Sequence, residues 1–103
     1  MSANFTMKTE RKNGSLYVIP SGDFDGNSAW ELLNLIEEQF TGSGNVIIET
    51  ERLQRLYPFG CQLFRSRFGL ACRLPAKRLF LKGRKGLELA PGGSRVVLHR
   101  KAS

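Results

Sequence analysis

The stretch that decides the fold is residues 16–38, LYVIPSGDFDGNSAWELLNLIEE, which joins a strand pattern directly to a helix pattern. The first part, read with the preceding residue as SLYVIPSG, predicts a strand. The helix is expected to begin near Asn27, because Ser28 and Glu31 have the spacing of a capping box. In that motif the serine oxygen accepts a hydrogen bond from the amide three residues on, and the glutamate reaches back.

The predicted helix has an apolar stripe that includes Trp30, Leu33 and Phe40, widened by Leu32 and Leu35. The segment TGSG at residues 41–44 ends it. We therefore expect this helix to pack on a sheet through that stripe.

A second strand is expected before this stretch, because FTMKTER at residues 5–11 alternates apolar or small residues with polar ones. Asn13-Gly14 between the two strand patterns is a strong hairpin signal. Pro20 lies late in the second strand and lacks an amide hydrogen, so that end is predicted to be a sheet edge or a bulge.

The residues after the helix predict further alternation of strands and helices. NVIIET, residues 45–50, has three consecutive β-branched apolar residues, which is typical of a parallel strand buried on both faces. The stretch LQRLYPFGCQLF, residues 53–64, is expected to be a loop that leads into a second helix, with Pro58 in its first turn. Tyr57, Cys61, Phe64 and Phe68 form one stripe at helical spacing, and Gly69 is a plausible stop.

The last segment adds two strands, KRLFL at residues 77–81 and RVVLH at residues 95–99, around a helix of one to two turns in GRKGLELAPGG. The order of elements is ββαβαβ(α)β. It predicts an α/β fold in one domain over residues 1–103, with a mixed, mainly parallel sheet of about five strands, two main helices and a short third helix.

Charge divides the chain into two parts. The net charge is +7, but residues 1–59 hold five Lys/Arg and eight Asp/Glu, whereas residues 60–103 hold eleven Lys/Arg and one acid. This asymmetry indicates an anionic partner for the basic part, although for any individual Lys or Arg we favour a solvated surface position. The candidate anion-binding residues are Arg73, Lys77, Arg78, Lys82, Arg84 and Lys85.

No residue pattern indicates catalysis, a metal or a cofactor. Asp23 and Asp25 could form a carboxylate pair, but Asp-Gly-Asn before a helix is also ordinary capping and turn chemistry, which we favour. His99 has no neighbouring nucleophile or carboxylate, and Cys61 lies on an apolar stripe. We therefore expect a non-enzymatic protein.

Three further expectations follow from composition. Phe59, Phe64, Phe68 and Phe80 stand at core-like spacings, so nucleic-acid binding would rest on charge alone. The first residues lack the apolar segment of a signal peptide, and no apolar run is long enough to span a bilayer. Cys61 and Cys72 match no zinc or redox spacing, which favours reduced thiols in a cytoplasmic protein.

The order of these pieces resembles a STAS domain, the module of bacterial anti-sigma-factor antagonists and of the cytoplasmic tails of sulfate transporters. The resemblance covers roughly residues 15–99. It includes Gly22-Asp23-Phe24-Asp25 at the end of a strand, the helix that follows, NVIIETERLQRLYPFG, and AKRLFLKGRKGLELAPGGSRVVL. It implies a STAS-like fold and a regulatory protein-interaction function.

The resemblance also assigns a site. Antagonists of the family carry Asp-Ser-Ser-Gly where this chain has Tyr57-Pro58-Phe59-Gly60, and a partner kinase phosphorylates the serine before the glycine. Here that position is Phe59, so the usual serine switch is absent. The implied partner is an anti-sigma-type kinase or another signalling protein. The candidate partner-binding residues are Asp25, Leu56, Tyr57, Pro58, Phe59, Gly60, Gln62 and Arg65.

Two questions stay open at this level. Tyr57 and Phe59 either form an exposed anchor ringed by arginine or turn inward as core. The alternative function is a basic module that binds an anionic partner, which would be nucleic acid, an acidic protein or a phospholipid surface. An enzyme with a cleft at the carboxyl ends of the strands is a third option.

Overall fold

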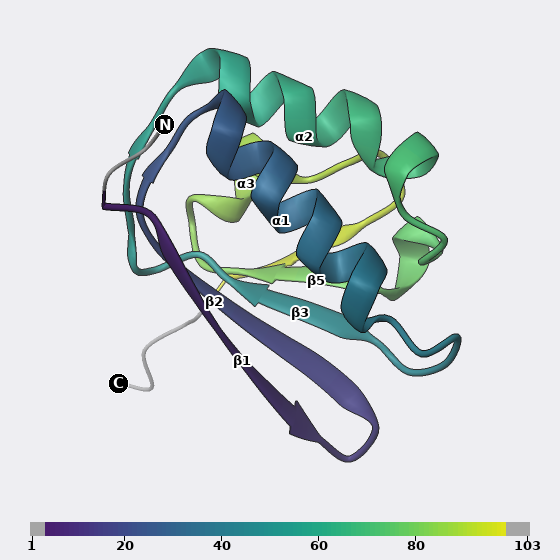
Figure 1. Cartoon of the computed structure of the whole chain (residues 1–103). Helices are drawn as coiled ribbons and strands as arrows, with labels where there is room; N and C mark the ends of the chain where they lie inside the picture. Colours follow the sequence, from purple (N-terminus) through teal and green to yellow (C-terminus); the bar gives the residue numbers. More distant parts are fainter. Residues whose placement is uncertain (1–3, 99–103) are drawn as a thin grey trace.

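The structure, a computed structural model, describes residues 4–98 (Figure 1). The strands and helices alternate as the sequence predicted, with boundaries that differ in detail. In chain order they are β1 (Thr6–Lys12), β2 (Ser15–Phe24), α1 (Gly26–Gln39), β3 (Val46–Glu49), β4 (Leu53–Leu56), α2 (Pro58–Ala71), the 3-10 helix η1 (Ala76–Arg78), β5 (Leu79–Lys82), α3 (Gly86–Leu89) and β6 (Arg95–Val97).

The sheet has the strand order β1-β2-β3-β5-β6, with β4 pairing to β2 beside this path. β1 is antiparallel to β2, and the other pairs are parallel. Asn13 and Gly14 both have positive φ, 52° and 80°, as the predicted two-residue hairpin requires. The mixed sheet is confirmed, and β4 is a strand where the sequence predicted a loop.

Pro20 lies where β2 changes its neighbour. Leu16 N donates to Asn45 O, and Gly22 N donates to Arg52 O. The backbone amides of the even-numbered residues of β2 therefore point toward β3 and β4. Pro20 is also even-numbered, but its position falls between the end of β3 at Glu49 and the start of β4 at Leu53. The missing amide hydrogen of Pro20 therefore lies between the two neighbouring strands, where no strand residue would accept it. The register of β2 with β4 is irregular between Gly22 and Phe24, which agrees with the expected bulge.

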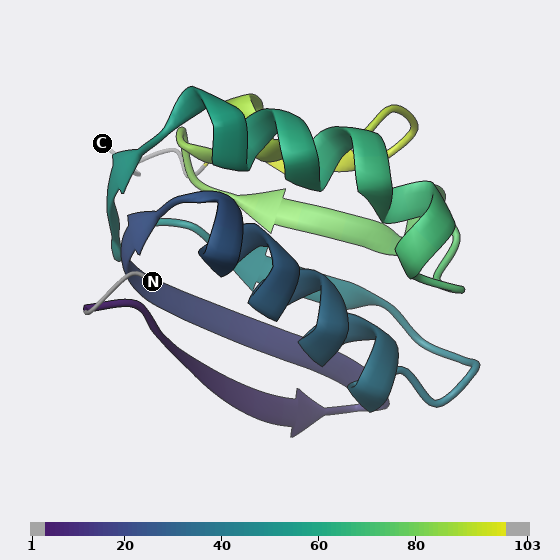
Figure 2. The ribbon, with the colours of Figure 1, turned by 45° about the horizontal axis from the view of Figure 1, so that its top comes forward.

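All three helices cover one face of the sheet. From β2 the chain moves to β3, then β5, then β6, always in one direction. Crossover connections between parallel strands are right-handed. When successive crossovers also move across the sheet in the same direction, their helices lie on the same face. Figure 2 shows α1 and α2 over that face. α3 lies there too, because a Cβ on Gly86 would be 2.8 Å from the Cβ of buried Leu81.

The strands consequently bury only every second side chain. Val46 and Ile48 are buried on the helix face, whereas Ile47 between them is only half-buried on the opposite face. The prediction that residues 45–50 are buried on both faces is therefore wrong. The prediction of a core position for Phe80 is also wrong, because Phe80 is half-buried on the same face as Ile47.

The core between sheet and helices centres on aromatic rings. Phe24 of β2 lies between Phe5 and Phe64, at ring-centroid distances of 6.1 and 6.3 Å, and Phe64 contacts Phe68 at 6.0 Å. These separations are those of favourable edge and tilted aromatic pairs. Cys61 of α2 joins this core as the sequence predicted, but Tyr57 of the same predicted stripe is 38% exposed.

Other boundaries differ because capping and packing decide them. α2 continues past Gly69 to Ala71 and ends where the Cys72 amide donates to Phe68 O. Lys77 and Arg78, expected in a strand, belong to η1, and β5 begins at Leu79. β6 ends at Val97, and His99 lies outside the described residues.

The start of α2 packs directly on the start of α1. A Cβ on Gly60 would lie 2.6 Å from both the carbonyl carbon and the oxygen of Asp25, closer than real Cβ atoms approach backbone. No such contact exists at Gly69 of the same helix, where a Cβ meets nothing within 4 Å. Glycine is thus required at residue 60 for packing and not at residue 69.

This difference gives a matched pair of variants. Gly60→Ala should lower the free energy of unfolding by about 1–3 kcal/mol, the usual cost of overpacking. Gly69→Ala should raise it by about 0.5–1 kcal/mol, because alanine is the better helix former. Urea denaturation followed by circular dichroism measures both, and similar shifts in the two variants would contradict the tight contact.

Candidate protein-interaction surface at the first turns of α1 and α2

Two segments meet at the carboxyl end of β2. The Tyr57 amide donates to Phe24 O at 2.9 Å, which ties the residue before α2 to the end of β2. Pro58 is the first residue of α2 and has no amide hydrogen to satisfy, as predicted. The starts of α1 and α2 therefore lie next to one another (Figure 1).

Asp25 caps α1, which corrects the predicted capping box. Its Oδ1 accepts hydrogen bonds from Ser28 N at 2.9 Å and from Ser28 Oγ at 3.0 Å. The helix begins at Gly26, so Ser28 is inside its first turn and fully buried. Its hydroxyl also lies 2.9 Å from the Asp23 carbonyl oxygen, and Ser28 thus connects the end of β2 to α1.

The cap accounts for the state of the Asp25 carboxyl. The backbone hydrogen bond from Ser28 has the largest effect and lowers its pKa. Burial opposes this with a smaller effect, and the hydroxyl of Ser28 lowers the pKa further. Asp25 is therefore ionised and occupied with capping. This supports the structural interpretation of the Asp23–Asp25 pair over an acid–base pair.

An aromatic patch, which we define as Trp30, Phe59 and Leu63, covers the junction of the two helices. Phe59 is 67% exposed and Trp30 is 42% exposed, while Leu63 is partly buried against the core. Asp25, Gly26 and Asn27 complete the shallow pocket around them. The question left open by the sequence is thereby answered: Phe59 is exposed and is not core.

Phe59 lies against backbone rather than in a cavity. A Cβ on Gly26 would be 2.9 Å from Phe59 Cε2, so the ring rests on the first turn of α1. Gly60 beside it approaches Asp25, and together the two glycines let the helix starts come close. The outer side of the Phe59 ring is left available for a partner.

The predicted partner-binding residues separate into two groups. Asp25, Tyr57, Pro58, Phe59 and Gln62 lie at or near the surface of this junction, whereas Leu56 is half-buried and Gly60 is buried. Arg65 lies elsewhere, because its guanidinium donates to Glu88 O of α3. The expected ring of arginine around Phe59 is therefore wrong for Arg65.

Two residues of the patch were missed as site residues. Trp30 was expected in the buried stripe of the first helix, but Leu32, Leu33 and Ile36 fill that stripe and leave Trp30 at its margin. Leu63 lies four residues after Phe59, one helical turn away, and this spacing was the available signal.

The predicted anion-binding residues do not form one cluster. Arg73 is engaged with α1: its Nε donates to Glu37 Oε2 at 2.8 Å, and its guanidinium also contacts Phe40 O at 3.3 Å. Lys77 and Arg78 lie before β5, at its amino end. Lys82, Arg84 and Lys85 lie at its carboxyl end, before α3.

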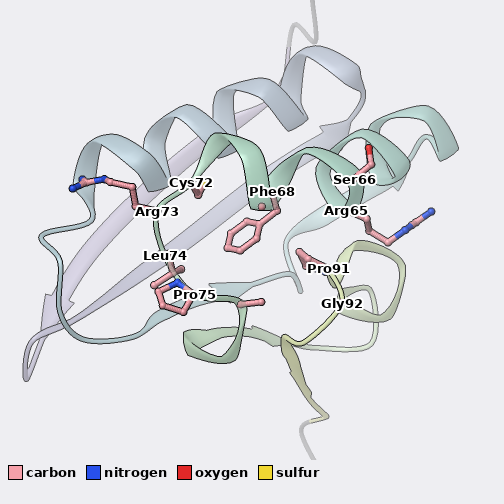
Figure 3. Close-up of a pocket in the computed structure, with 11 residues that line it drawn as sticks. Arg65, Ser66, Phe68, Cys72, Arg73, Leu74, Pro75, Pro91 and Gly92 are labelled. Atoms are coloured by element: carbon pink, nitrogen blue, oxygen red, sulfur yellow. The ribbon is translucent and has the colours of Figure 1, made fainter.

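A second pocket lies between the end of α2 and the loops before η1 and β6 (Figure 3). Phe68 points into it, while the Arg65 and Arg73 side chains extend away from it. Cys72 lines it, and burial raises the pKa of its thiol to about 11, so the thiol is protonated at neutral pH. The pocket therefore offers no activated nucleophile.

Two kinds of feature are absent from residues 4–98. No three histidine, cysteine or acidic side chains come together there as ligands for a metal ion. None of the helices in that range has the length and apolar character to cross a bilayer.

The fold matches known structures. It superposes on the anti-sigma factor antagonist SpoIIAA, solved in its unphosphorylated form, with a TM-score of 0.55 and 17% identity, over 95% of this chain and 89% of that one. The crystal structure of Mglu gives a TM-score of 0.54 and 16% identity, over 91% of this chain and 19% of that one. No family model and no curated protein matches the sequence. The similarity confirms the STAS-like fold.

The Asp25 cap gives a prediction about acid stability. Asp25→Ala should lower the free energy of unfolding by about 0.5–2 kcal/mol at pH 7, because α1 loses its capping acceptor. Asp25→Asn should lower the free energy of unfolding much less, since asparagine is an equally good capping residue.

The stability of wild type and of Asp25→Asn should depend differently on pH in the acid range. The folded-state pKa of Asp25 is lowered, so its contribution is complete above about pH 4 and is lost as pH falls through the folded pKa. Urea denaturation between pH 2 and 7 should show a steeper acid loss in the wild type than in Asp25→Asn. Parallel pH profiles would contradict an ionised cap.

Proposed function

We propose that this chain is a regulatory protein-interaction module that binds another protein through the aromatic patch. The observation that carries the proposal is the exposure of Phe59, 67%, beside Trp30 at 42%. Large aromatic side chains in the centre of an interface supply much of its binding energy. An exposed pair on two packed helices therefore supports a binding role.

The surroundings of the patch have the composition of an interface rim. Asp25, Asn27 and Gln62 supply polar groups around the three apolar side chains. The patch is also small, which fits one anchor that enters a cavity of the partner. The first turns of α1 and α2 are held together by close backbone contact, which supports a preformed site.

The proposed module works without a serine switch at this loop. Residues 56–62, Leu-Tyr-Pro-Phe-Gly-Cys-Gln, contain no serine or threonine, and Ser28 nearby is buried. Binding would then be controlled by the presence of the partner or by changes on its side. SpoIIAA is an anti-sigma factor antagonist, so a protein of the anti-sigma class is the first partner to test.

The proposal includes the absence of catalysis and a cytoplasmic setting. Asp25 is used as a helix cap, and burial raises the pKa of the Cys61 and Cys72 thiols, so none of these groups is poised for chemistry. Both cysteines are buried and free, which supports a reducing compartment.

The decisive experiment compares Phe59→Ala with wild type in affinity capture from bacterial lysate, with mass spectrometry of the captured proteins. Loss of an exposed anchor should reduce partner affinity by about 2 kcal/mol or more, roughly thirtyfold. Leu87→Ala is the matched control, because Leu87 is an exposed apolar side chain, 58% in solvent, and belongs to α3 and not to the patch. Equal capture by Phe59→Ala and wild type would refute the proposal.

Stability measurements separate this result from misfolding. Phe59→Ala should change the free energy of unfolding by less than about 1 kcal/mol, since most of its ring is already in water. Phe64→Ala, which empties a fully buried position, should cost about 3–5 kcal/mol. If both variants lost similar stability, any loss of binding by Phe59→Ala would reflect the fold and not an anchor.

A further inference from the structure

The face of the sheet opposite the helices is uncovered among the described residues. Parallel strands usually have both faces covered, because their crossover helices pack on each side. Here β2, β3, β5 and β6 advance in one direction, and α1 and α2 lie on one face (Figure 2), where α3 also packs against Leu81. Within residues 4–98 no helix packs on the other, which we call the open face.

The open face carries two aromatic rings in one row. Tyr17 pairs with Ile47, and Ile47 pairs with Phe80, so these three side chains cross β2, β3 and β5 in register. All three are half-buried and alternate with residues buried on the helix face. Two strand spacings, roughly 10 Å, separate Tyr17 from Phe80, with Ile47 between them.

Cations stand at both ends of this row. Lys12 lies over the Tyr17 ring, with its Nζ 5.7 Å from the centroid. Arg95 of β6 pairs with Phe80 in register and therefore shares its face. Phe80 thus has a basic register partner, whereas Tyr17 has Lys12 over its ring and the carboxylate Glu10 as its register partner in β1.

The remaining charges of this face are mixed, and with Lys12 and Arg95 the strands keep a small excess of cations, four against three carboxylates. Register and alternation place Lys8 and Lys82 here, together with the carboxylates Glu10, Glu49 and Asp23. Two of the carboxylates share cations of this face, because Glu10 Oε1 lies 3.7 Å from Lys12 Nζ and Glu49 pairs in register with Lys82. Lys77, Arg78 and Arg84 add positive charge at the two ends of β5.

We propose that the open face binds single-stranded nucleic acid, with Tyr17 and Phe80 as stacking platforms for bases and Lys8, Lys12, Lys82 and Arg95 as neighbours of the phosphates. Aromatic rings on an exposed sheet among cations are the chemistry by which single strands are held. A second copy of the chain suits this face less well, because two faces with an excess of cations would repel each other.

This site is separate from the aromatic patch. Phe59 and Trp30 belong to the helix layer, and Tyr17 and Phe80 point from the other face of the sheet. The inference therefore does not depend on the proposed function. Failure of Phe59→Ala to affect protein capture would leave nucleic-acid binding untouched, and the reverse also holds.

The test is fluorescence anisotropy with labelled mixed-sequence RNA and DNA 12-mers and with the corresponding DNA duplex, across a range of salt concentrations. Single strands should bind on the order of tenfold more tightly than the duplex, whose bases cannot reach the rings. Tyr17→Leu and Phe80→Leu keep apolar bulk and remove the stacking surface, and each should weaken binding by about fivefold or more. Arg95→Ala should weaken binding and reduce its salt dependence.

Phe59→Leu is the matched control, because it removes an exposed aromatic ring from the other surface, and its affinity should equal that of wild type. Thermal melting confirms that each variant folds. Equal affinity for duplex and single strand, or unchanged affinity in the two leucine variants, would overturn the proposal. It would also be overturned if sedimentation showed a dimer that Tyr17→Leu dissociates, because a second copy would then occupy the open face.

Discussion

The first turn of α2 lies against the backbone of Asp25 with room for only a hydrogen atom at residue 60. This contact fixes both the position of α2 and its rotation about its own axis. With Gly60 inward, Cys61, Phe64 and Phe68 enter the core, and Phe59 is turned out to solvent. The exposed aromatic patch and the aromatic core are thus two results of one steric constraint.

A second constraint acts on the sheet. Because the parallel strands follow one another in one direction, the helices form a single layer, and the chain has two faces of different chemistry. The helix face closes a core around Phe24 and Phe64. The open face presents Tyr17, Ile47 and Phe80 among charged neighbours. The two surfaces that we propose as binding sites therefore differ in chemistry.

Local sequence patterns predict most of the elements, because their causes lie within a few residues. Asn13-Gly14 determines its hairpin by its own backbone preferences, and the spacing of Cys61, Phe64 and Phe68 identifies the inner side of α2. The resemblance to STAS domains adds the arrangement of the elements, which the structure shares with SpoIIAA.

The features that sequence reasoning missed depend on contacts between distant segments. β4 is only four residues long and exists because β2 extends beyond β3, which nothing in LQRL reveals. Whether Ile47 and Phe80 face protein or solvent depends on which side the crossovers pass. The capping residue of α1 was placed at Ser28 rather than Asp25 because both residue types cap helices well, and burial of the Ser28 hydroxyl decides between them.

The far ends of the two main helices are also joined. Arg73, just after α2, donates to the Glu37 carboxylate from both its backbone amide and its side chain, and its guanidinium lies 5.8 Å from the Phe40 ring centroid. Together with the Gly60 contact, this holds the helix pair at both ends. Such a pair loses little conformational entropy when a partner docks on it, and it has little freedom to change shape in response. If the aromatic patch binds a partner as proposed, the helix layer would report that partner through occupancy and would not relay a conformational signal across the domain.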